Sequence, residues 1–331
     1  MKILIVRTSS LGDLIHMLPA ISDIKKHHPD ATIDWVVEEA FTEIPHWHAA
    51  IHRVIVVAHR RWRRSWWSDR SKAERQAALD QLRSVSYDLV LDMQGLMKSV
   101  WLVKAAHGVK HGLSWLSTRE PLCAFFYDHR HRVKIWQPAV TRQRQLAAMA
   151  LGYTPEGPPD FGLEHLIASN PNTDCADPSD DTTYAAYAVI MPSASRDNKL
   201  WPSEDWQAVF DRLQGAGLAL RLLAGNDAER QRAQQLIGSR PNTTLQPKSS
   251  LTELAALISG ARLMVGLDSG LTHLSAAVGT DTIGIYKAST PARTPLVGRG
   301  FVASLGDKGC PPDRAEVLAA IDTALSSSTQ I

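Results

Sequence analysis

The sequence predicts an α/β protein with two similar halves, each a parallel sheet with helices on both faces. Three observations lead to this fold class. Short apolar runs alternate with stretches whose apolar residues recur at helical spacing, as in βαβ units. The alternation stops at a proline-rich stretch near the middle and then restarts. The 331 residues, 44% of them apolar, can bury the cores of two domains. Two such halves would face one another across a central cleft.

In the first half, strands are expected at the apolar runs 2–6, 31–37, 52–57 and 87–93. A helix follows the first run, because apolar residues recur at helical spacing between Leu14 and Ile24. Pro19 falls inside this pattern and predicts a kink or a late helix start near it.

A linker is placed at residues 153–179, where prolines such as Pro155, Pro171 and Pro178 mix with Gly, Asn, Asp and Ser. This gives domains 1–165 and 166–331. After the linker, strands are expected at 187–191, 218–223, 263–267 and 282–286. Helices are expected from about Ser203, up to about Ile237, over 251–259 and over 314–325.

Composition excludes several classes of protein. The cysteines Cys123, Cys175 and Cys310 are widely spaced, which favours reduced thiols over a disulfide framework or a zinc site. No run approaches the roughly 20 apolar residues of a membrane span, and residues 1–6 are too short for a signal peptide. A soluble, cytosolic protein is therefore expected. The net charge of +2 is too small to indicate a nucleic-acid partner.

The stretch from Arg262 to Gly279 is typical of a buried strand, a tight turn and a helix start. The turn is Asp268-Ser269-Gly270. Glycine lets the backbone approach a ligand closely, and the free amides of a helix start carry roughly half a positive charge, which stabilises a phosphate. His273, in the first turn, can add a donor. The alternative is that Asp268 or Ser269 only caps the helix while His273 faces solvent.

Two further segments in the second half carry candidate binding residues, one for a diphosphate and one for a sugar or ribose hydroxyl. The loop 193–202 carries Ser195 and Lys199, a hydroxyl and a compact cation that would lie beside the turn and suit a diphosphate. Glu229 follows the loop 225–227 and can accept hydrogen bonds from a sugar or ribose hydroxyl. The alternatives are an ordinary surface lysine and a first-turn glutamate favoured by the helix dipole.

In the first half, Asp13, Gln94 and Lys98 all follow predicted strands. Parallel sheets bind ligands at the carboxyl ends of their strands, so the Asp13 carboxylate can project into the cleft. The alternative for Asp13 is an N-cap. The loop 7–13 lacks both the dinucleotide-binding and the P-loop glycine patterns, which weakens a dinucleotide or NTPase hypothesis.

Residues 59–67 form the strongest local charge feature. Four arginines (Arg60, Arg61, Arg63 and Arg64) stand with Trp62, Trp66 and Trp67. Guanidinium groups bind phosphates and carboxylates, and indole rings offer apolar faces to sugar or lipid. A solvated basic face and a surface for single-stranded nucleic acid are the alternatives. The histidines nearby lack the spacing of metal ligands.

These features recur together in one known family. The residues that carry the resemblance are Thr8–Asp13 with Leu18–Ala20, 34–39, 44–50, Arg60–Arg63, Gln94-Gly95 with Lys98, Arg119–Pro121, Arg196-Asp197 with Lys199, Trp201 and Pro202, and Asp268–His273. The chain resembles the lipopolysaccharide heptosyltransferases of glycosyltransferase family 9 over most of its length. The last two motifs are characteristic of the family, and the Arg60–Arg63 segment distinguishes its type I enzymes from type II.

The resemblance implies a GT-B fold, with an N-terminal Rossmann-like domain that binds the acceptor and a C-terminal one that binds the donor. It implies inverting transfer of L-glycero-D-manno-heptose from ADP-heptose to the first Kdo of Kdo2-lipid A, without a metal or other cofactor. A monomer at the cytoplasmic face of the inner membrane is expected. The implied roles are Asp13 as general base with Lys199 also catalytic; Ser195, Lys199, Glu229, Asp268, Ser269, Gly270 and His273 on the donor; and Arg60, Arg61, Arg63, Arg64, Lys98 and Arg119 on the acceptor.

The chain departs from the family pattern in two places. Lys287 to Pro291 replaces a Gly-Pro-Thr-like turn, so that the Lys287 cation either contacts the nucleotide or points away. Ala194-Ser195 replaces paired threonines, which removes one hydroxyl. Two alternatives stay open: a type II enzyme or another GT-B nucleotide-sugar transferase, and a non-catalytic protein whose basic segment docks on anionic membrane or nucleic acid.

Overall fold

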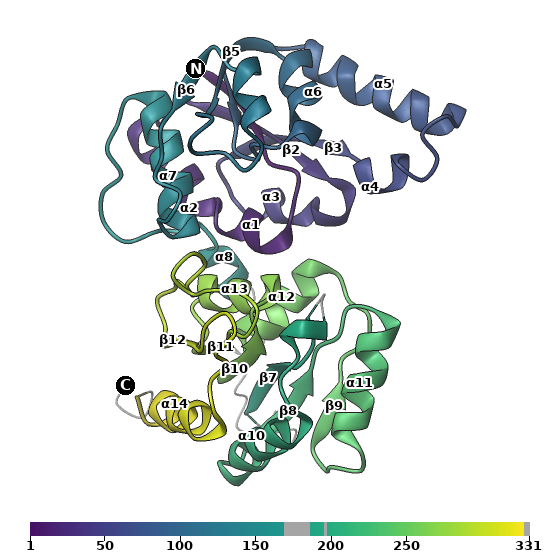
Figure 1. Cartoon of the computed structure of the whole chain (residues 1–331), viewed down its shortest axis with the longest axis vertical. Coiled ribbons are helices and arrows are strands. Elements are labelled where there is room, and N and C mark those ends of the chain that lie inside the picture. The colour runs from purple at the N-terminus through teal and green to yellow at the C-terminus, as the bar shows by residue number, and fades with distance from the viewer. Residues whose placement is uncertain (169–185, 195–196, 328–331) are drawn as a thin grey trace. The chain divides into compact units, whose positions relative to one another are not determined.

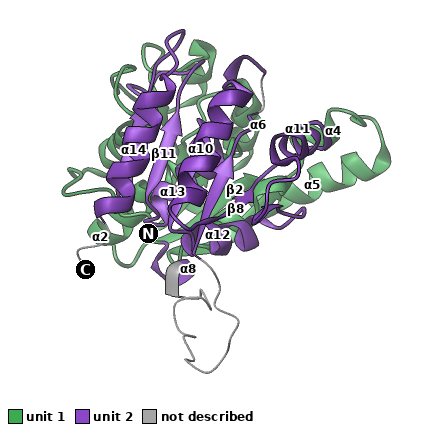
Figure 2. Cartoon of the chain, turned by 90° about the horizontal axis from the view of Figure 1, so that it is seen from below, with its two compact units in different colours: residues 1–162 green, residues 163–331 purple. Residues whose placement is uncertain are grey.

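The structure is a computed structural model that describes residues 1–168, 186–194 and 197–327 (Figure 1). The chain divides into two compact units, Met1–Gly162 and Leu163–Ile331 (Figure 2). The division falls within the stretch predicted as a linker. From residue 169 onward that stretch, with Pro171, Cys175 and Pro178, lies outside the described residues.

The first unit contains a six-stranded parallel sheet with the order β3-β2-β1-β4-β5-β6. Its strands are β1 (Lys2–Val6), β2 (Thr32–Glu38), β3 (Ile51–Val57), β4 (Ser86–Asp92), β5 (His107–Leu113) and β6 (His129–His131). The four strands predicted for this half are confirmed to within one residue, and β5 and β6 were not predicted. The interior of β1, from Ile3 to Val6, is fully buried, as expected for a strand covered on both faces.

Helices cover both faces of this sheet. The connection β1–α2–β2 and the connection β4–α6–β5 run in opposite directions across the sheet, and right-handed crossovers therefore place α2 (Leu18–His27) and α6 (Met97–Ala105) on opposite faces. α7 (Ala139–Leu151) packs on α2, and α5 (Asp69–Arg83) packs on α6 (Figure 1).

Details of the sequence explain how the α2 layer forms. A short helix, α1 (Leu11–Ile15), ends before α2 begins, and Pro19 lies in the first turn of α2, so the predicted late start is confirmed. A buried ion pair joins Arg144 of α7 to Asp23 of α2 at 2.7 Å. The two charges meet only when α2 and α7 are aligned in one way along their axes, so the ion pair favours that alignment.

The second unit contains another six-stranded parallel sheet, with the order β12-β11-β10-β7-β8-β9. Its strands are β7 (Tyr187–Met191), β8 (Ala219–Leu222), β9 (Thr243–Leu245), β10 (Leu263–Leu267), β11 (Thr282–Ile285) and β12 (Val302–Leu305). The four strands predicted here are confirmed to within one residue at each end. Numbered within its own unit, each sheet reads third-second-first-fourth-fifth-sixth, the doubly wound order. The strand order reverses between β1 and β4 in the first sheet and between β7 and β10 in the second, and these are the two switch points.

Helices also cover both faces of the second sheet. α10 (Ser203–Gly215), α11 (Asp227–Ile237) and α14 (Arg314–Ser327) belong to one layer, and α12 (Leu251–Ser259) and α13 (Gly270–Ala277) to the other. Figure 1 shows α10 and α14 side by side. Trp206 and Phe210 of α10 are buried in the core beneath them. The shorter elements are η1 (Glu39–Phe41), α3 (Glu43–His46), α4 (His59–Trp62), η2 (Pro121–Phe126), α8 (Glu164–Ala168) and η3 (Asp197–Lys199).

Two expectations from composition can be compared with the described residues. Cys123 and Cys310 are free thiols, as expected. Among the described residues, every helix is too short or too polar to cross a bilayer.

Candidate active site

At the switch point of the first unit, the loop after β1 is held by the loop after β4. Gln94 Oε1 accepts hydrogen bonds from the backbone N–H groups of Thr8 at 3.0 Å and Ser9 at 3.2 Å. The backbone N–H of Gln94 in turn donates to Asp92 Oδ1 at 2.8 Å. Asp92 is fully buried, and this burial raises its pKa. Gln94 is therefore a clamp that fixes the position of the β1 loop.

Asp13 lies on α1, directly after this loop, and its side chain is 42% exposed. Its Oδ1 pairs with Arg7 Nη2 at 2.8 Å, while Oδ2 accepts from Ser10 N at 3.0 Å and Ser10 Oγ at 2.9 Å. Ser10, rather than Asp13, is the N-cap residue. Burial acts to raise the pKa of Asp13, but the Arg7 guanidinium and the Ser10 hydrogen bonds outweigh it and hold the pKa below its usual value. Asp13 is thus a partly exposed carboxylate that is ionised at neutral pH.

Lys98, in the first turn of α6, belongs to the same neighbourhood. Its Nζ donates to Ser9 Oγ at 2.6 Å. Its pKa is lowered, first by burial and then by the charges of Arg7 and Arg60, while Glu38 and Asp13 act in the opposite direction. The segments after β1, β3 and β4 therefore bring Arg7, Arg60 and Lys98 into one neighbourhood with the Asp13 carboxylate. An anionic group would find compensating charge there.

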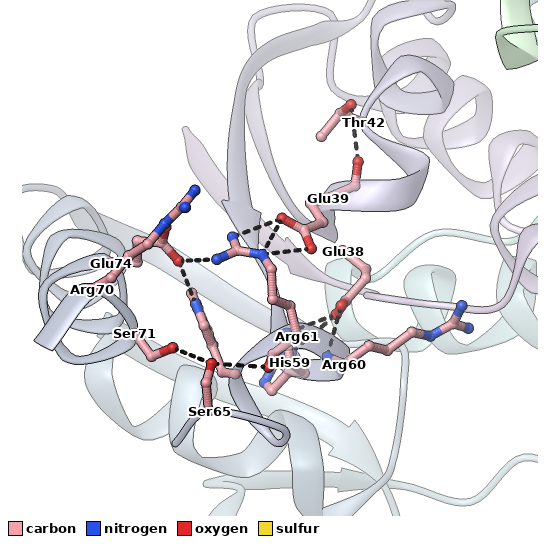
Figure 3. A network of polar contacts seen from close by, with 11 residues as sticks. Glu38, Glu39, Thr42, His59, Arg60, Arg61, Ser65, Arg70, Ser71 and Glu74 are labelled. Atoms are coloured by element: carbon pink, nitrogen blue, oxygen red, sulfur yellow. Dashed lines mark hydrogen bonds and ion pairs between the residues drawn. The ribbon is translucent and has the colours of Figure 1, made fainter. Parts of the chain in front are cut away.

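The basic segment is anchored to the end of β2 through α4 (Figure 3). Glu38, the buried last residue of β2, accepts the backbone N–H groups of His59 at 3.2 Å and Arg60 at 3.0 Å. Burial tends to raise the pKa of Glu38, but hydrogen bonds from His59 and Arg60 lower it overall. The free amides at the start of α4 are thus satisfied by a carboxylate.

Arg61 lies between two carboxylates and is tied to both, as Figure 3 shows. Its Nη2 is 2.8 Å from Glu39 Oε2, and its Nη1 is 2.7 Å from Glu74 Oε2. Trp62 Nε1 also donates to Glu74, at 2.8 Å, and the Trp62 ring is buried. The expectation that Trp62 offers its ring to a ligand is therefore wrong, because the ring packs in the core. Arg61 and Trp62 fix the segment in place.

The remaining predicted acceptor residues are exposed. The Arg60 guanidinium lies 5.3 Å from the centre of the Phe41 ring. Arg63 and Arg64 follow α4 and are exposed. Arg119 is exposed on the loop between β5 and η2. Strands β3, β4 and β5 thus each lead into a segment that carries one or more predicted acceptor residues.

In the second unit, Asp268 and Lys199 bridge the switch point. Asp268 follows β10, and Lys199 lies on the segment after β7. Lys199 Nζ donates to Asp268 Oδ2 at 2.7 Å and to the Asp268 carbonyl at 3.0 Å. Ser289 Oγ also donates to Asp268 Oδ2. Burial tends to raise the pKa of Asp268, but hydrogen bonds from His273, Lys199 and Ser289 hold it far below its usual value.

The start of α13 has the predicted form. Ser269 is the N-cap and accepts the backbone N–H of Thr272 at 3.4 Å, and Gly270 is the first helical residue. His273 is only 5% exposed, and its Nε2 lies 3.1 Å from Asp268 Oδ1. The alternative in which His273 faces solvent is therefore wrong, whereas the capping role of Ser269 is confirmed. The Ser269 side chain satisfies only one of the free backbone N–H groups at the start of α13, so other N–H groups of the first turn can still bind an anion.

Beside this helix start, a cavity of about 220 Å³ opens along the carboxyl ends of β7, β8 and β9. It is lined by Met191, Leu223, Ala224, Gly225, Gln246, Pro247, Lys248, Ser249, Leu254 and Leu271. The cavity could not be located from the sequence, because β9 carries too weak a strand pattern to place the loop after it. The mixture of apolar walls and a few polar groups is typical of small-molecule sites.

Glu229 is buried next to this cavity, on α11. Its Oε2 accepts the backbone N–H of Gly225 at 2.8 Å, and its Oε1 accepts from Asn226 Nδ2 at 2.8 Å. The carboxylate therefore shapes the β8–α11 loop, and Gly225 lines the cavity. Each carboxylate oxygen retains capacity for a further hydrogen bond.

The remaining expectations concern the residues near Lys199 and the question of a metal site. Ser195 and Arg196 lie outside the described residues. Lys287 Nζ donates to the carbonyl of Leu200 at 2.7 Å, so this extra cation supports the loop that carries Lys199. Within the described ranges, no group of three or more His, Cys, Asp or Glu side chains is arranged to hold a metal ion.

Paired Rossmann-like units with polar side chains at both switch points suit an α/β enzyme that acts on a nucleotide sugar. Comparison with known proteins narrows this class. The family model described as "Glycosyltransferase family 9 (heptosyltransferase)" matches residues 75–320. The chain belongs to this family and is a glycosyltransferase.

Individual relatives agree with this assignment. The chain is 42% identical over 293 residues to lipopolysaccharide heptosyltransferase 1 of Escherichia coli K12, covering 88% of this chain and 89% of the relative. It is 40% identical over 314 residues to the Pseudomonas aeruginosa protein of the same name, covering 94% and 86%. The solved structure of E. coli heptosyltransferase WaaC with ADP matches with a TM-score of 0.88 and 38% identity, covering 98% of this chain and 100% of that one. The expected GT-B fold is thereby confirmed.

Proposed function

We propose that this glycosyltransferase moves L-glycero-D-manno-heptose from ADP-heptose to the first Kdo of Kdo2-lipid A, with inversion, during synthesis of the lipopolysaccharide inner core. The observation that carries the proposal is the similarity to heptosyltransferase 1 proteins over most of the chain, together with the ionised Asp13 at the first switch point. The solved E. coli WaaC with ADP-2-deoxy-2-fluoro heptose, 38% identical with a TM-score of 0.83 over 99% of both chains, supports ADP-heptose as the donor.

The second unit is proposed to hold the donor. The first-turn amides of α13 would bind the diphosphate, with Lys199 supplying a positive charge beside it. The cavity beside α13 would take the adenosine, since its apolar walls suit a base ring. Glu229, next to the cavity, would accept a ribose hydroxyl. Ser195, Asp268 and His273 are proposed to complete this site, the last two by orienting Lys199 and the helix start.

The first unit is proposed to hold the acceptor. Arg60, Arg63, Arg64 and Arg119 are exposed, and guanidinium groups bind carboxylates and phosphates in a bidentate manner. Lys98 adds a charge close to Asp13. Arg61 is assigned an indirect role in acceptor binding, because its contacts with Glu39 and Glu74 hold the segment that presents the other arginines.

In the proposed mechanism, Asp13 removes the proton from the attacking Kdo hydroxyl. Transfer with inversion passes through a transition state resembling an oxocarbenium ion, so a carboxylate of low pKa can accept the proton late. As the bond to ADP breaks, negative charge grows on the diphosphate. Lys199 and the start of α13 would stabilise that charge. No metal is required for these steps, and we propose that the enzyme works without one.

The acceptor also determines where the enzyme acts. We propose that the chain works as a monomer at the cytoplasmic face of the inner membrane, where a glycolipid acceptor would be presented. A type II heptosyltransferase is the nearest alternative. The solved E. coli heptosyltransferase II is 19% identical to this chain, against 38% for WaaC, which favours type I.

The test is release of ADP from ADP-heptose with Kdo2-lipid A, with its deacylated form, and with an acceptor that already carries one heptose. Release that requires a heptose-free acceptor supports the proposal. Release only with the heptose-bearing acceptor would assign the chain to type II. Binding of acceptor without any release would favour the non-catalytic alternative.

A further inference from the structure

Large apolar side chains are exposed together on the first unit, on the loop after β5 and on η2. Trp115, Leu116, Leu122 and Phe125 have exposed fractions of 46, 60, 62 and 65%. The rings of Trp115 and Phe125 are in contact, with centroids 5.5 Å apart. These four side chains form the apolar patch. Isolated exposed apolar residues are common, but a group of this size on neighbouring positions indicates an interaction surface.

The segment that carries the apolar patch is firmly held. Glu120 Oε2 accepts the backbone N–H of Met97 at 2.6 Å, at the start of α6. Thr118 Oγ1 donates to the Gly95 carbonyl at 2.8 Å. Cys123 of η2 is completely buried. Because the backbone is fixed at several points, the apolar side chains are presented by a rigid platform.

Basic side chains border the apolar patch. The Arg130 guanidinium lies 5.4 Å from the centre of the Trp115 ring, and Arg119 is exposed between Leu116 and Leu122 in the sequence. Arg132 is exposed on a segment that bonds to the patch loop, where Ser114 N–H donates to the His131 carbonyl at 2.9 Å.

The acidic residues of the same stretch are engaged with the backbone. Glu120 accepts from Met97, and Asp128 Oδ2 accepts the N–H of Lys110 at 2.8 Å. These contacts hold the two carboxylates in place but leave them charged, so the border of three arginines and two carboxylates has a net positive charge.

We propose that the apolar patch and its arginine border dock on the anionic surface of a phospholipid bilayer. Trp, Leu and Phe side chains enter the boundary between headgroups and acyl chains, and arginines pair with lipid phosphates. The arginine border favours a lipid surface over a folded protein partner. Every phospholipid headgroup carries a phosphate, so each arginine can pair with one whatever its position in the border.

This docking surface adjoins the proposed acceptor site. η2 packs on α6, the helix that carries Lys98, and Arg119 belongs to both the border and the proposed acceptor residues. In this respect the inference rests on the proposed function. Docking through the apolar patch would bring the acceptor residues to the level of the headgroups, where a lipid-anchored sugar is presented.

The first test measures binding of the full chain to vesicles of phosphatidylethanolamine and phosphatidylglycerol by cosedimentation. Substitution of Leu116 and Phe125 by Ser is expected to weaken binding at least about tenfold, since two apolar side chains no longer leave water. Met149→Ser, on α7, removes a side chain that is 48% exposed elsewhere on the first unit and should bind as the wild type does. Failure of the wild type to bind, equal binding by the double variant, or an equal loss with Met149→Ser would overturn the proposal.

The second test separates docking from catalysis. With a deacylated acceptor in solution, the double variant should turn over at the wild-type rate, because neither residue belongs to the proposed site. With the acylated acceptor embedded in vesicles, its rate should fall in step with its binding. If the proposed transfer reaction is wrong, the wild type uses neither acceptor while vesicle binding persists. If docking is wrong, the variant matches the wild type on both acceptors.

Discussion

Replacement of Asp13 by Asn tests the proposed mechanism most directly. The amide keeps the size of the side chain and one oxygen that can accept from Arg7 or Ser10, but it cannot take a proton from the acceptor hydroxyl. Loss of a positioned general base reduces the rate about 10²–10⁴-fold, or about 3–5 kcal/mol of transition-state stabilisation. The ion pair with Arg7, 2.8 Å long, becomes a hydrogen bond, which costs about 1–3 kcal/mol of the free energy of unfolding.

The assay measures kcat by ADP release, the affinity for ADP by calorimetry, and thermal unfolding. We expect kcat to fall while the affinity for ADP is unchanged, since every described contact of Asp13 lies within the first unit. Asp30→Asn is the matched control. Asp30 is exposed just before β2, at the amino edge of the same sheet, so the identical chemical change should leave the rate unaffected. A folded Asp13→Asn protein that retains more than about a tenth of the wild-type kcat would refute the base assignment.

A second variant tests what sets the pKa of the Asp13 carboxylate. Ser10→Ala removes the hydroxyl that donates to Asp13 Oδ2 at 2.9 Å while keeping the base itself. This hydrogen bond lowers the pKa of Asp13, so its loss raises the pKa. The acid limb of the profile of kcat/KM against pH should therefore move to higher pH, with little change at neutral pH. An acid limb that stays in place would show that another group controls it.

Three further predictions concern other parts of the chain. Lys199→Met should weaken ADP binding about 10–100-fold, since a charge-assisted contact contributes about 1.5–3 kcal/mol; calorimetry measures this, and unchanged affinity would contradict the donor role. Glu74→Gln should raise KM for the acceptor several-fold with kcat nearly constant, because the ion pair between Arg61 and Glu74, 2.7 Å long, becomes a weaker hydrogen bond to a neutral amide, whereas a fall in kcat alone would argue against positioning. Burial, with His131 and His129 nearby, lowers the pKa of His111 to about 4, so the unfolded chain, with a pKa near 6.5, takes up the proton first as pH falls. Thermal stability should drop between pH 6.5 and 4, and less so in His111→Gln.

The strands that could be predicted from the sequence are those with strong apolar runs. The central strands β1 and β10 are buried on both faces, so nearly every residue must be apolar. The edge strands β6 and β9 carry no such signal. β6 consists of His129, Arg130 and His131, and β9 has only three residues. These segments become strands because a neighbouring strand offers hydrogen bonds at the right register, which local sequence does not encode.

The candidate site could be predicted to a similar extent. Residues that follow strands must reach the carboxyl edge of a parallel sheet, so Asp13, Lys98 and Asp268 were identifiable from position. Their partners were less accessible, because Lys199 and Asp268 are 69 residues apart. The contacts of Arg61 with Glu39 and Glu74 likewise depend on how α4, η1 and α5 pack. An arginine in a basic run therefore cannot be assigned to a ligand or to a carboxylate without the fold.

The two units share one strand order, yet their carboxylates at the switch points differ in a way that decides which one can act as a base. Asp268 is 12% exposed, and Lys199, His273 and Ser289 all bond to it, so its pKa lies far below the usual value and a proton on it is strongly disfavoured. Asp13 is 42% exposed, and its pKa is also held below the usual value, by Arg7 and the Ser10 hydrogen bonds. Asp13 is the more exposed of the two carboxylates, which is why it is the one proposed as the base. On that proposal, the same topology supplies a structural anion in one unit and a reactive one in the other.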